Sequence, residues 1–299
     1  YLSESIAGDP IPVTGMVLVP DGDAPDDGRL VLTLAHGTTG IADECAPSKE
    51  GAAEAVAAIP AIDRGWVVAI TDYEGLGTPG RHPYLVGESE GRGVLDAVLA
   101  AAAVPEADTG TDVLIGGYSQ GGHGALWANQ IAEEWTPGID VLGTFAGAPA
   151  TEIPVILSAA SLPGVSAFAL MVVAGFAAAY PEADPALVLT DEGVDHLDVV
   201  DQGCTGGVRA ALAALDGPIV REGAASVEPW ATLAAENDPG QVATGVPVLI
   251  AHSDGDRSVP PAFSAMLVDR MCDVGQVVER RVLVGAGGHV EAAPEAYRQ

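Results

Sequence analysis

Basic side chains are scarce in this chain of 299 residues. Twelve Lys and Arg stand against 42 Asp and Glu, Lys49 is the only lysine, and the formal net charge is −30. A field of this sign repels nucleic acids and anionic membranes, so neither is expected as a partner. The charge fits either a surface adapted to high salt, which screens self-repulsion, or a genome that favours Asp, Ala, Gly and Arg.

Cysteine and long apolar runs are also few. Cys45, Cys204 and Cys272 form no C-x-x-C or other metal-ligand spacing, so no metal site is expected. Three free thiols would suit a cytosolic enzyme, whereas one disulfide and one remaining thiol would suit an exported protein. The most apolar stretch, residues 166–180, is short and bounded by prolines, so no stable membrane insertion is expected.

A G-x-S-x-G motif at residues 117–121 is the strongest signal that the chain does contain. The apolar run 111–116 precedes it, and residues 122–132 follow with helical spacing, which is the strand, turn and helix context of a nucleophilic serine. Small residues on either side of Ser119 permit a sharp turn, and the following helix points its N-terminus at the same place. The motif therefore predicts Ser119 as a nucleophile. The alternative is a glycine-rich turn whose serine only caps the helix.

Short apolar strands alternate with helices along much of the chain. Strands are expected at 13–19, 29–35, 66–71, 111–116, 140–145, 247–251 and 277–284, and helices at 51–62, 88–103, 122–132, 261–272 and from about 291. This alternation predicts an α/β fold with a mostly parallel central sheet flanked by helices.

The alternation stops between residues 145 and 246. A gap of about a hundred residues is far longer than an ordinary connection. Helical patterns recur within it at 151–160, 166–180, 186–191, 195–201 and 207–215. We expect a helical cap at 148–240, inserted into a core of 1–147 and 241–299. An apolar stripe in the second pattern is either helix packing or part of an acyl pocket; it consists of Phe168, Leu170, Met171, Val172 and Phe176.

A nucleophilic serine needs a base, and the base needs a group to orient it. In this topology the chain order is serine, then acid, then histidine. His289 lies in a glycine-rich loop after the last expected strand, whereas His252 ends a strand one loop too early and His196 falls in the expected cap. The position of His289 predicts that it is the base.

Two carboxylates follow the strand at 247–251. Asp254 and Asp256 both lie in the next loop, and the pattern of an Asp separated by two residues from Val259-Pro260 selects Asp256 as the acid. An ionised carboxylate there would stabilise the imidazolium in the transition state. Asp254 remains the alternative, and the residue not used is expected to be a solvated turn residue.

An oxyanion hole needs two backbone N–H donors. Gln120 follows the nucleophile and is expected to supply one of them. The loop after the strand at 29–35 should supply the other, from Thr38 or, alternatively, from Thr39. His36 begins this loop and is interpreted as a brace for it.

Four blocks of sequence resemble one known family. They are His36-Gly-Thr-Thr-Gly40, Cys45-Ala-Pro-Ser48, residues 71–80 (T-D-Y-E-G-L-G-T-P-G) and residues 116–122. The chain resembles the secretory lipase family, the lipase A-like α/β-hydrolases of fungi and actinobacteria. The resemblance implies an α/β-hydrolase fold with an inserted helical cap and hydrolysis of carboxylic esters, often triacylglycerols. It also implies export and a disulfide from Cys45 to Cys204 in the cap, with Cys272 left without an obvious partner.

These observations predict a serine carboxylic-ester hydrolase that forms an acyl-enzyme without a metal or organic cofactor. The expected substrate is a small-molecule or lipid ester, and the expected state is a secreted monomer that touches lipid interfaces only transiently. Because Tyr1 stands where an initiator Met would be, we expect that a signal peptide has been removed or the sequence trimmed. The alternatives are an acyltransferase, a polyesterase, an amide or peptide hydrolase on the same residues, and a non-catalytic binding protein. Periodicity does not determine the acyl chain length.

Overall fold

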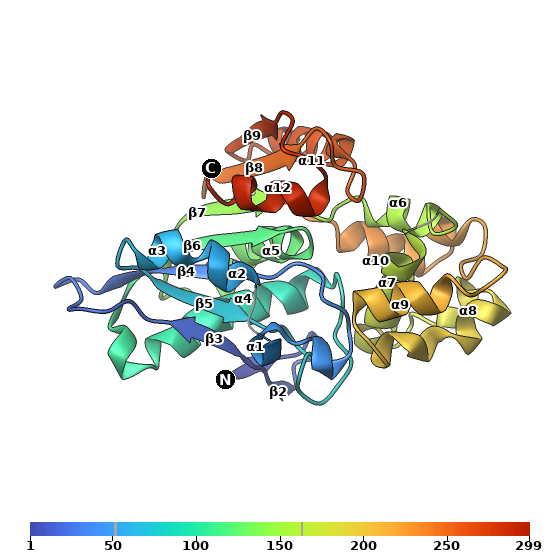
Figure 1. Ribbon diagram of the computed structural model, residues 1–299, viewed down its shortest axis with the longest axis horizontal. Coiled ribbons are helices and arrows are strands. Elements are labelled where there is room, and N and C mark those ends of the chain that lie inside the picture. The colour runs from blue at the N-terminus through green and yellow to red at the C-terminus, as the bar shows by residue number, and fades with distance from the viewer. Residues whose placement is uncertain (51–52, 163) are drawn as a thin grey trace.

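A seven-stranded sheet lies at the centre of the computed structural model, which describes residues 1–50, 53–162 and 164–299 (Figure 1). The strands are β3 (Gly15–Leu18), β4 (Arg29–Ala35), β5 (Val67–Thr71), β6 (Thr109–Tyr118), β7 (Asp140–Gly147), β8 (Val248–Ser253) and β9 (Val278–Leu283). Their order is β3-β5-β4-β6-β7-β8-β9, with β3 antiparallel to β5 and the other neighbours parallel. The expected mostly parallel sheet is confirmed.

Helices cover both faces of this sheet because each presents an apolar side to it. One face carries α4 (Gly87–Ala102), α5 (Gln120–Trp135) and α11 (Pro261–Asp273). The other face carries α3 (Ile59–Ile62), preceded by α2 (Ala53–Ala57), and α12 (His289–Ala296). The remaining short elements are β1 (Leu2–Glu4), β2 (Pro10–Pro12), η1 (Asp43–Cys45), α1 (Pro47–Glu50) and η2 (Pro105–Ala107).

A group of helices fills the interval between β7 and β8 and lies beside one end of the sheet (Figure 1). Its members are α6 (Ile153–Ser158), α7 (Ser166–Ala179), η3 (Pro185–Leu187), α8 (Asp191–Asp195), η4 (Leu197–Asp201), α9 (Thr205–Leu212), η5 (Ala224–Ser226) and α10 (Trp230–Glu236). We call it the inserted segment. Its core forms around α7, where Phe176 stacks on Trp230 with ring centroids 6.1 Å apart. The apolar stripe expected there is largely buried, so most of it serves packing.

Several expected boundaries were wrong. Positions 51 and 52 of the helix expected at 51–62 lie outside the described residues. The rest of that range forms two short helices, α2 and α3, instead of one. A helix expected at 186–191 is absent from the described residues there: a 3₁₀ turn ends at Leu187, and α8 only begins at Asp191. The side chain of Thr190 accepts a hydrogen bond from the Gly193 N–H at 3.1 Å and caps the N-terminus of α8. A helix therefore begins at 191, the position at which the sequence predicted that one ends. The last helix begins at His289 rather than near 291, and α10, β1 and β2 were not predicted.

Among the described residues, contacts at several places attach the inserted segment to the core. At one, a disulfide joins Cys45 to Cys204, as the resemblance implied, and the Thr205 N–H donates to the Thr39 carbonyl at 2.9 Å. Cys272 is an exposed free thiol. Among the described residues, none of the helices combines the length and the apolar character needed to cross a membrane.

Another attachment is where the inserted segment begins and ends. The Ile153 N–H donates to the Asp238 carboxylate at 3.1 Å, although 85 positions separate the two residues. Arg270 of α11 binds the Glu152 carboxylate at 3.0 Å and the Pro239 carbonyl at 3.1 Å. The first and last residues of the segment therefore meet on one core helix.

Candidate active site

The turn from β6 into α5 places Ser119 at the end of the central strand. Ser119 has φ of 61° and ψ of −119°, a backbone conformation that L-residues seldom adopt. A Cβ at Gly117 would lie 2.0 Å from the Gly121 carbonyl oxygen, and one at Gly121 would lie 2.0 Å from the Ala35 carbonyl oxygen. Only glycine fits either position, so the G-x-S-x-G pattern is what allows the chain to turn this sharply.

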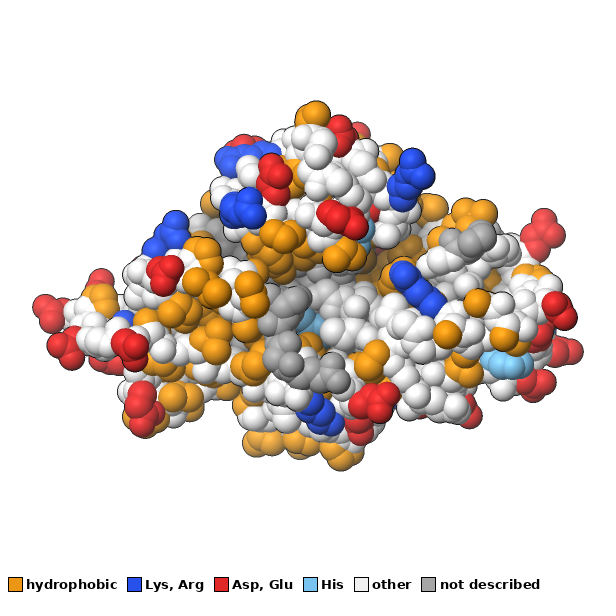
Figure 2. Space-filling view, in the orientation of Figure 1, with side chains coloured by type: hydrophobic (Ala, Val, Ile, Leu, Met, Phe, Trp, Pro, Cys, Tyr) orange, Lys and Arg blue, Asp and Glu red, His pale blue; other side chains and the backbone are white. Residues whose placement is uncertain are grey.

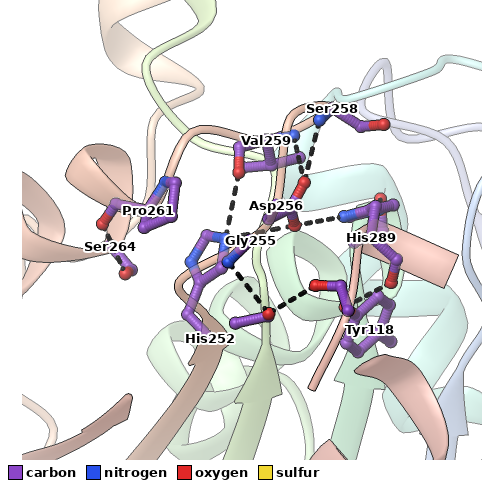
Figure 3. Close-up of polar contacts among 12 residues, drawn as sticks. Tyr118, His252, Gly255, Asp256, Ser258, Val259, Pro261, Ser264 and His289 are labelled. Carbon is purple, nitrogen blue, oxygen red and sulfur yellow. Dashed lines mark hydrogen bonds and ion pairs between the residues drawn. The ribbon is translucent and has the colours of Figure 1, made fainter. Parts of the chain in front are cut away.

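Ser119, His289 and Asp256 come together from three distant segments. His289 Nε2 lies 2.9 Å from Ser119 Oγ, and His289 Nδ1 lies 2.6 Å from Asp256 Oδ2. The side chain of His289 is 14% exposed and that of Asp256 is fully buried. Figure 3 shows Asp256 between His252 and His289, at the end of β8. The arrangement gives the serine hydroxyl an imidazole acceptor that a carboxylate orients.

Several donors surround the Asp256 carboxylate. The backbone N–H groups of Ser258 and Val259 donate to its Oδ1 at 2.8 and 3.0 Å, and His252 Nε2 lies 3.2 Å from its Oδ2 (Figure 3). Burial alone would raise the pKa of Asp256, but the hydrogen bonds from His252 and His289 and from the Val259 N–H hold that pKa well below its ordinary value. The carboxylate is therefore ionised at neutral pH.

The alternative acid has a different position. Asp254 is exposed and accepts a hydrogen bond from the Gly285 N–H at 3.0 Å. Asp254 therefore holds the backbone of the loop that leads to His289, and no contact joins it to the imidazole ring among the described residues. Of the two candidate carboxylates, the structure pairs His289 with Asp256.

The loop after β4 lies against Ser119. A Cβ at Gly37 would be 3.9 Å from Ser119 Cβ, and the Thr38 hydroxyl lies 2.9 Å from the Tyr84 hydroxyl. Gln120 is the first residue of α5, so its backbone N–H has no hydrogen-bond acceptor within the helix. His36 is fully buried, and the Tyr73 hydroxyl donates to its carbonyl at 3.1 Å, which matches the expected bracing role. The carbonyl of Thr39, the alternative donor, accepts a hydrogen bond from the Thr205 N–H of the inserted segment.

With this geometry in place, comparison with known proteins is informative. The model of the family described as "Secretory lipase" matches residues 50–295. This chain belongs to the secretory lipase family. A secreted triacylglycerol lipase of Malassezia globosa is 25% identical over 214 residues, which cover 67% of this chain and 46% of that protein. A probable inactive lipase of Mycobacterium tuberculosis is 26% identical over 166 residues, or 51% of this chain and 36% of that protein.

Solved structures support the same fold. The X-ray structure of Candida antarctica lipase A in its closed state superposes with a TM-score of 0.77 at 20% identity, covering 98% of this chain and 73% of that one. At this identity the likeness shows the α/β-hydrolase fold alone. This secretory lipase chain spans less than half the length of the two curated relatives above.

A second carboxylate–imidazole pair, which the sequence did not suggest, lies between α4 and α5 in this member of the secretory lipase family. Glu90 of α4 and His123 of α5 are both fully buried, with Glu90 Oε2 2.7 Å from His123 Nδ1. The other ring nitrogen, Nε2, lies 2.9 Å from the Asn237 carbonyl oxygen at the end of α10. We call Glu90 and His123 the buried pair. Burial opposes protonation of His123, but the Glu90 carboxylate and hydrogen bonds raise its pKa above the ordinary value.

The buried pair is linked to Gln120. The Gln120 side-chain NH₂ donates to Glu90 Oε1 and to His82 Nε2, both at 2.8 Å. His82 Nδ1 lies 2.9 Å from the Glu74 carbonyl oxygen, so Nδ1 carries the proton and Nε2 accepts. Burial lowers the pKa of His82 to about 4, which keeps the ring neutral at pH 7. Within the described ranges, no three His, Cys, Asp or Glu side chains could hold a metal ion together.

Proposed function

We propose that the protein is a serine carboxylic-ester hydrolase that acts through an acyl-enzyme. The observation that carries the proposal is the line of hydrogen bonds from Asp256 through His289 to Ser119, with distances of 2.6 and 2.9 Å. Membership of the secretory lipase family adds the class of substrate, an acyl ester.

In the proposed reaction, Ser119 Oγ attacks the ester carbonyl carbon while His289 Nε2 takes its proton. Asp256 stays ionised and stabilises the imidazolium. The tetrahedral oxyanion accepts hydrogen bonds from the N–H groups of Gln120 and Thr38. His289 then protonates the departing alcohol, and water, activated by the same histidine, releases the acid.

Two further assignments belong to this proposal. Residues 148–240 form a cap over the site, in line with the helices that lie beside the end of the sheet. The protein is exported, which the Cys45–Cys204 disulfide supports because such bonds persist in oxidising compartments. The substrates are small-molecule or lipid esters, in keeping with a curated relative named as a secreted triacylglycerol lipase.

The test is hydrolysis of p-nitrophenyl esters from acetate to palmitate, by the wild type beside Ser119→Ala, over a series of salt concentrations. Turnover by the wild type and none by the variant supports the proposal, and the chain-length profile separates a lipase from a short-chain esterase. No turnover of any ester at any salt concentration contradicts it. That result would favour an amide substrate or a non-catalytic protein, as the name of the Mycobacterium tuberculosis relative suggests for that protein.

A further inference from the structure

His252 is a buried imidazole that the proposed reaction does not use. It lies close to the end of β8, and its side chain is fully buried. Its Nε2 lies 3.2 Å from Asp256 Oδ2 and 3.0 Å from the Val259 carbonyl oxygen (Figure 3). No contact among the described residues joins His252 to Ser119 or to His289, so the ring does not take the serine proton directly.

The partners of Nε2 determine which ring nitrogen of His252 carries the hydrogen. A carbonyl oxygen and an ionised carboxylate can only accept hydrogen bonds. Nε2 faces one of each, so it is the donor to both. Nδ1 is buried and has no hydrogen-bond partner in the part of the chain that the structure describes, so every polar contact of the ring passes through Nε2. His252 therefore serves its neighbours only as a donor.

The hydrogen bond from His252 completes the set of donors on the Asp256 carboxylate. Oδ1 accepts from the Ser258 and Val259 N–H groups at 2.8 and 3.0 Å, and Oδ2 accepts from His289 Nδ1 at 2.6 Å. A carboxylate offers about four lone-pair sites, and His252 takes the fourth, on the same oxygen that faces His289. Because all four are then occupied, a rotation of the carboxylate about its Cβ–Cγ bond would break contacts at both oxygens.

The sheet sets the position of the His252 ring. β8 pairs in parallel with β7 on one side and with β9 on the other, and His252 lies opposite Val282. The ring also holds the far end of the loop after β8, because Nε2 donates to the carbonyl of Val259 while the Val259 N–H donates to Asp256. A group on a strand that is paired on both sides is a more rigid support than one on a loop.

We propose that His252 is a positioning residue for ester hydrolysis, which holds the Asp256 carboxylate in the orientation in which Oδ2 accepts the hydrogen bond from His289 Nδ1. The inference rests on the proposed function, and His252 acts through Asp256 without touching the substrate. A carboxylate that is free to turn would spend part of its time away from His289, and the imidazole would then lose the partner that selects its tautomer. The expected deficit is in kcat, because Asp256 stabilises the imidazolium that forms in the transition state.

The first experiment compares two replacements of His252 with p-nitrophenyl acetate as substrate. His252→Gln places an amide NH₂ near the position of Nε2 and can keep both hydrogen bonds, whereas His252→Phe keeps a ring without a donor. We expect His252→Phe to lower kcat by about 10- to 100-fold, as the loss of outer partners of metal ligands typically does in metalloenzymes, with little change in KM. His252→Gln should keep a kcat close to that of the wild type.

The matched control is His196→Phe in the inserted segment. His196 is half-buried, and its Nδ1 lies 2.8 Å from the Glu192 carbonyl oxygen, so the variant also removes an imidazole that bonds to a carbonyl. It should leave kcat unchanged. An unchanged kcat in His252→Phe, or equal losses in His252→Phe and His252→Gln, would overturn the proposal.

A double-mutant cycle separates a positioning role from a merely structural one. If His252 acts through Asp256, His252→Phe should cost little once Asp256→Asn has removed the carboxylate. The residual catalysis of such variants, about 10³- to 10⁴-fold over water, is enough to measure this. A packing defect would lower kcat by the same factor in both backgrounds, so equal factors would overturn the proposal.

A spectroscopic measurement covers the case in which His252→Phe does not fold. Ser119→Ala protein with ¹⁵N-labelled histidine is studied by NMR, where each ring nitrogen reports whether it carries a proton, and the signals of His252 are those missing after His252→Gln. A proton on Nε2 of His252 supports the proposal, and Nε2 without a proton overturns it. The kinetic data separate the two assignments: a wild type that hydrolyses no ester overturns both, whereas turnover by the wild type beside an unimpaired His252→Phe overturns the positioning role alone.

Discussion

Two carboxylate–imidazole pairs are nearly identical in length: one contacts Ser119, and the other includes His123 of α5, the helix that follows Ser119. Asp256 and His289 are 2.6 Å apart, and Glu90 and His123 are 2.7 Å apart. They differ at the second ring nitrogen. In His289 it meets the hydroxyl of Ser119, which can give up a proton, whereas in His123 it meets the Asn237 carbonyl, which can only accept one.

Exposure separates the two pairs as well. The side chain of His289 is 14% exposed, while those of Glu90 and His123 are fully buried. The first pair is therefore open to solvent at His289, whereas the second joins α4, α5 and the end of α10 inside the protein. Residue types alone therefore do not distinguish the two pairs, but their exposure and the partner of the second ring nitrogen do.

The strongest test of this contrast is Ser119→Ala, which removes the hydroxyl that contacts His289 and is the nucleophile of the proposed reaction. We expect the kcat for p-nitrophenyl esters to fall by about a millionfold, since loss of the nucleophile removes the acyl-enzyme route. The thermal unfolding midpoint should stay close to that of the wild type. Ser226→Ala, at an exposed serine of η5, is the control and should retain full activity. Activity in Ser119→Ala would show that another residue is the nucleophile.

The acid of the first pair is tested next. Asp256→Asn should lower kcat by about 10⁴-fold, because an amide no longer selects the imidazole tautomer that accepts the serine proton. Asp254→Asn should lower it only slightly, because Asp254 bonds to the Gly285 backbone. Steady-state kinetics with one short ester decides between them. The reverse ranking would mean that the acid is Asp254.

For the buried pair the expected effect is on stability. Glu90→Gln leaves His123 without its carboxylate in a fully buried site, and breaking such a pair costs about 3–5 kcal/mol of unfolding free energy. Urea denaturation measures this. The matched control is Glu88→Gln on the same helix: its carboxylate is half-exposed and its partner Arg92 also binds Glu4, so the loss should be less than about 1 kcal/mol. Equal losses in both variants would contradict the structural role of the buried pair.

The neutral imidazole beside the buried pair should make stability pH-dependent. The pKa of His82 is about 4 in the folded protein, against about 6.5 in the unfolded chain, so the unfolded chain binds more protons between these values. Stability should therefore fall by about 3 kcal/mol as the pH drops from 6.5 to 4. In His82→Gln, the loss of unfolding free energy between pH 6.5 and 4 should be smaller by this amount. The difference between the proteins isolates His82, because burial raises the pKa of Asp238 to about 6 and gives an opposite slope in both. Identical slopes would contradict the assignment.

Part of this contrast could be predicted from sequence. Ser119, Asp256 and His289 each follow a strand of the parallel sheet, and the carboxyl ends of such strands meet at one edge, so spacing and order were enough to bring them together. The buried pair gave no such signal. A glutamate at position 90 in a helical pattern is usually solvated, and its partner lies 33 residues away on another helix, so only tertiary packing reveals it.

The remaining misses also have physical causes. Periodicity identifies apolar strands but not which elements cover their side chains, so an apolar groove lined by Leu114 and Phe145, on the sheet face that carries α3 and α12, could not be anticipated. Figure 2 shows hydrophobic side chains gathered on this side of the molecule, between the helices labelled α3 and α12 in Figure 1. In the inserted segment, the Thr190 cap decided where α8 starts, and one side-chain hydrogen bond outweighed a weak helical pattern. Helices in such segments depend on their neighbours more than on their own propensity.

The hydrogen bond between the Ile153 N–H and the Asp238 carboxylate has a consequence for how this fold can diversify. A segment whose two ends meet can be exchanged as a unit, because a replacement needs the same short span between its ends and a cysteine to pair with Cys45, and it leaves the pairing of the seven-stranded sheet intact. Recombination at positions 152 and 239 would therefore replace the inserted segment and leave the sheet unchanged, with Arg270 of the recipient bound to both junctions. The same two positions are the natural splice points for a library of chimaeras.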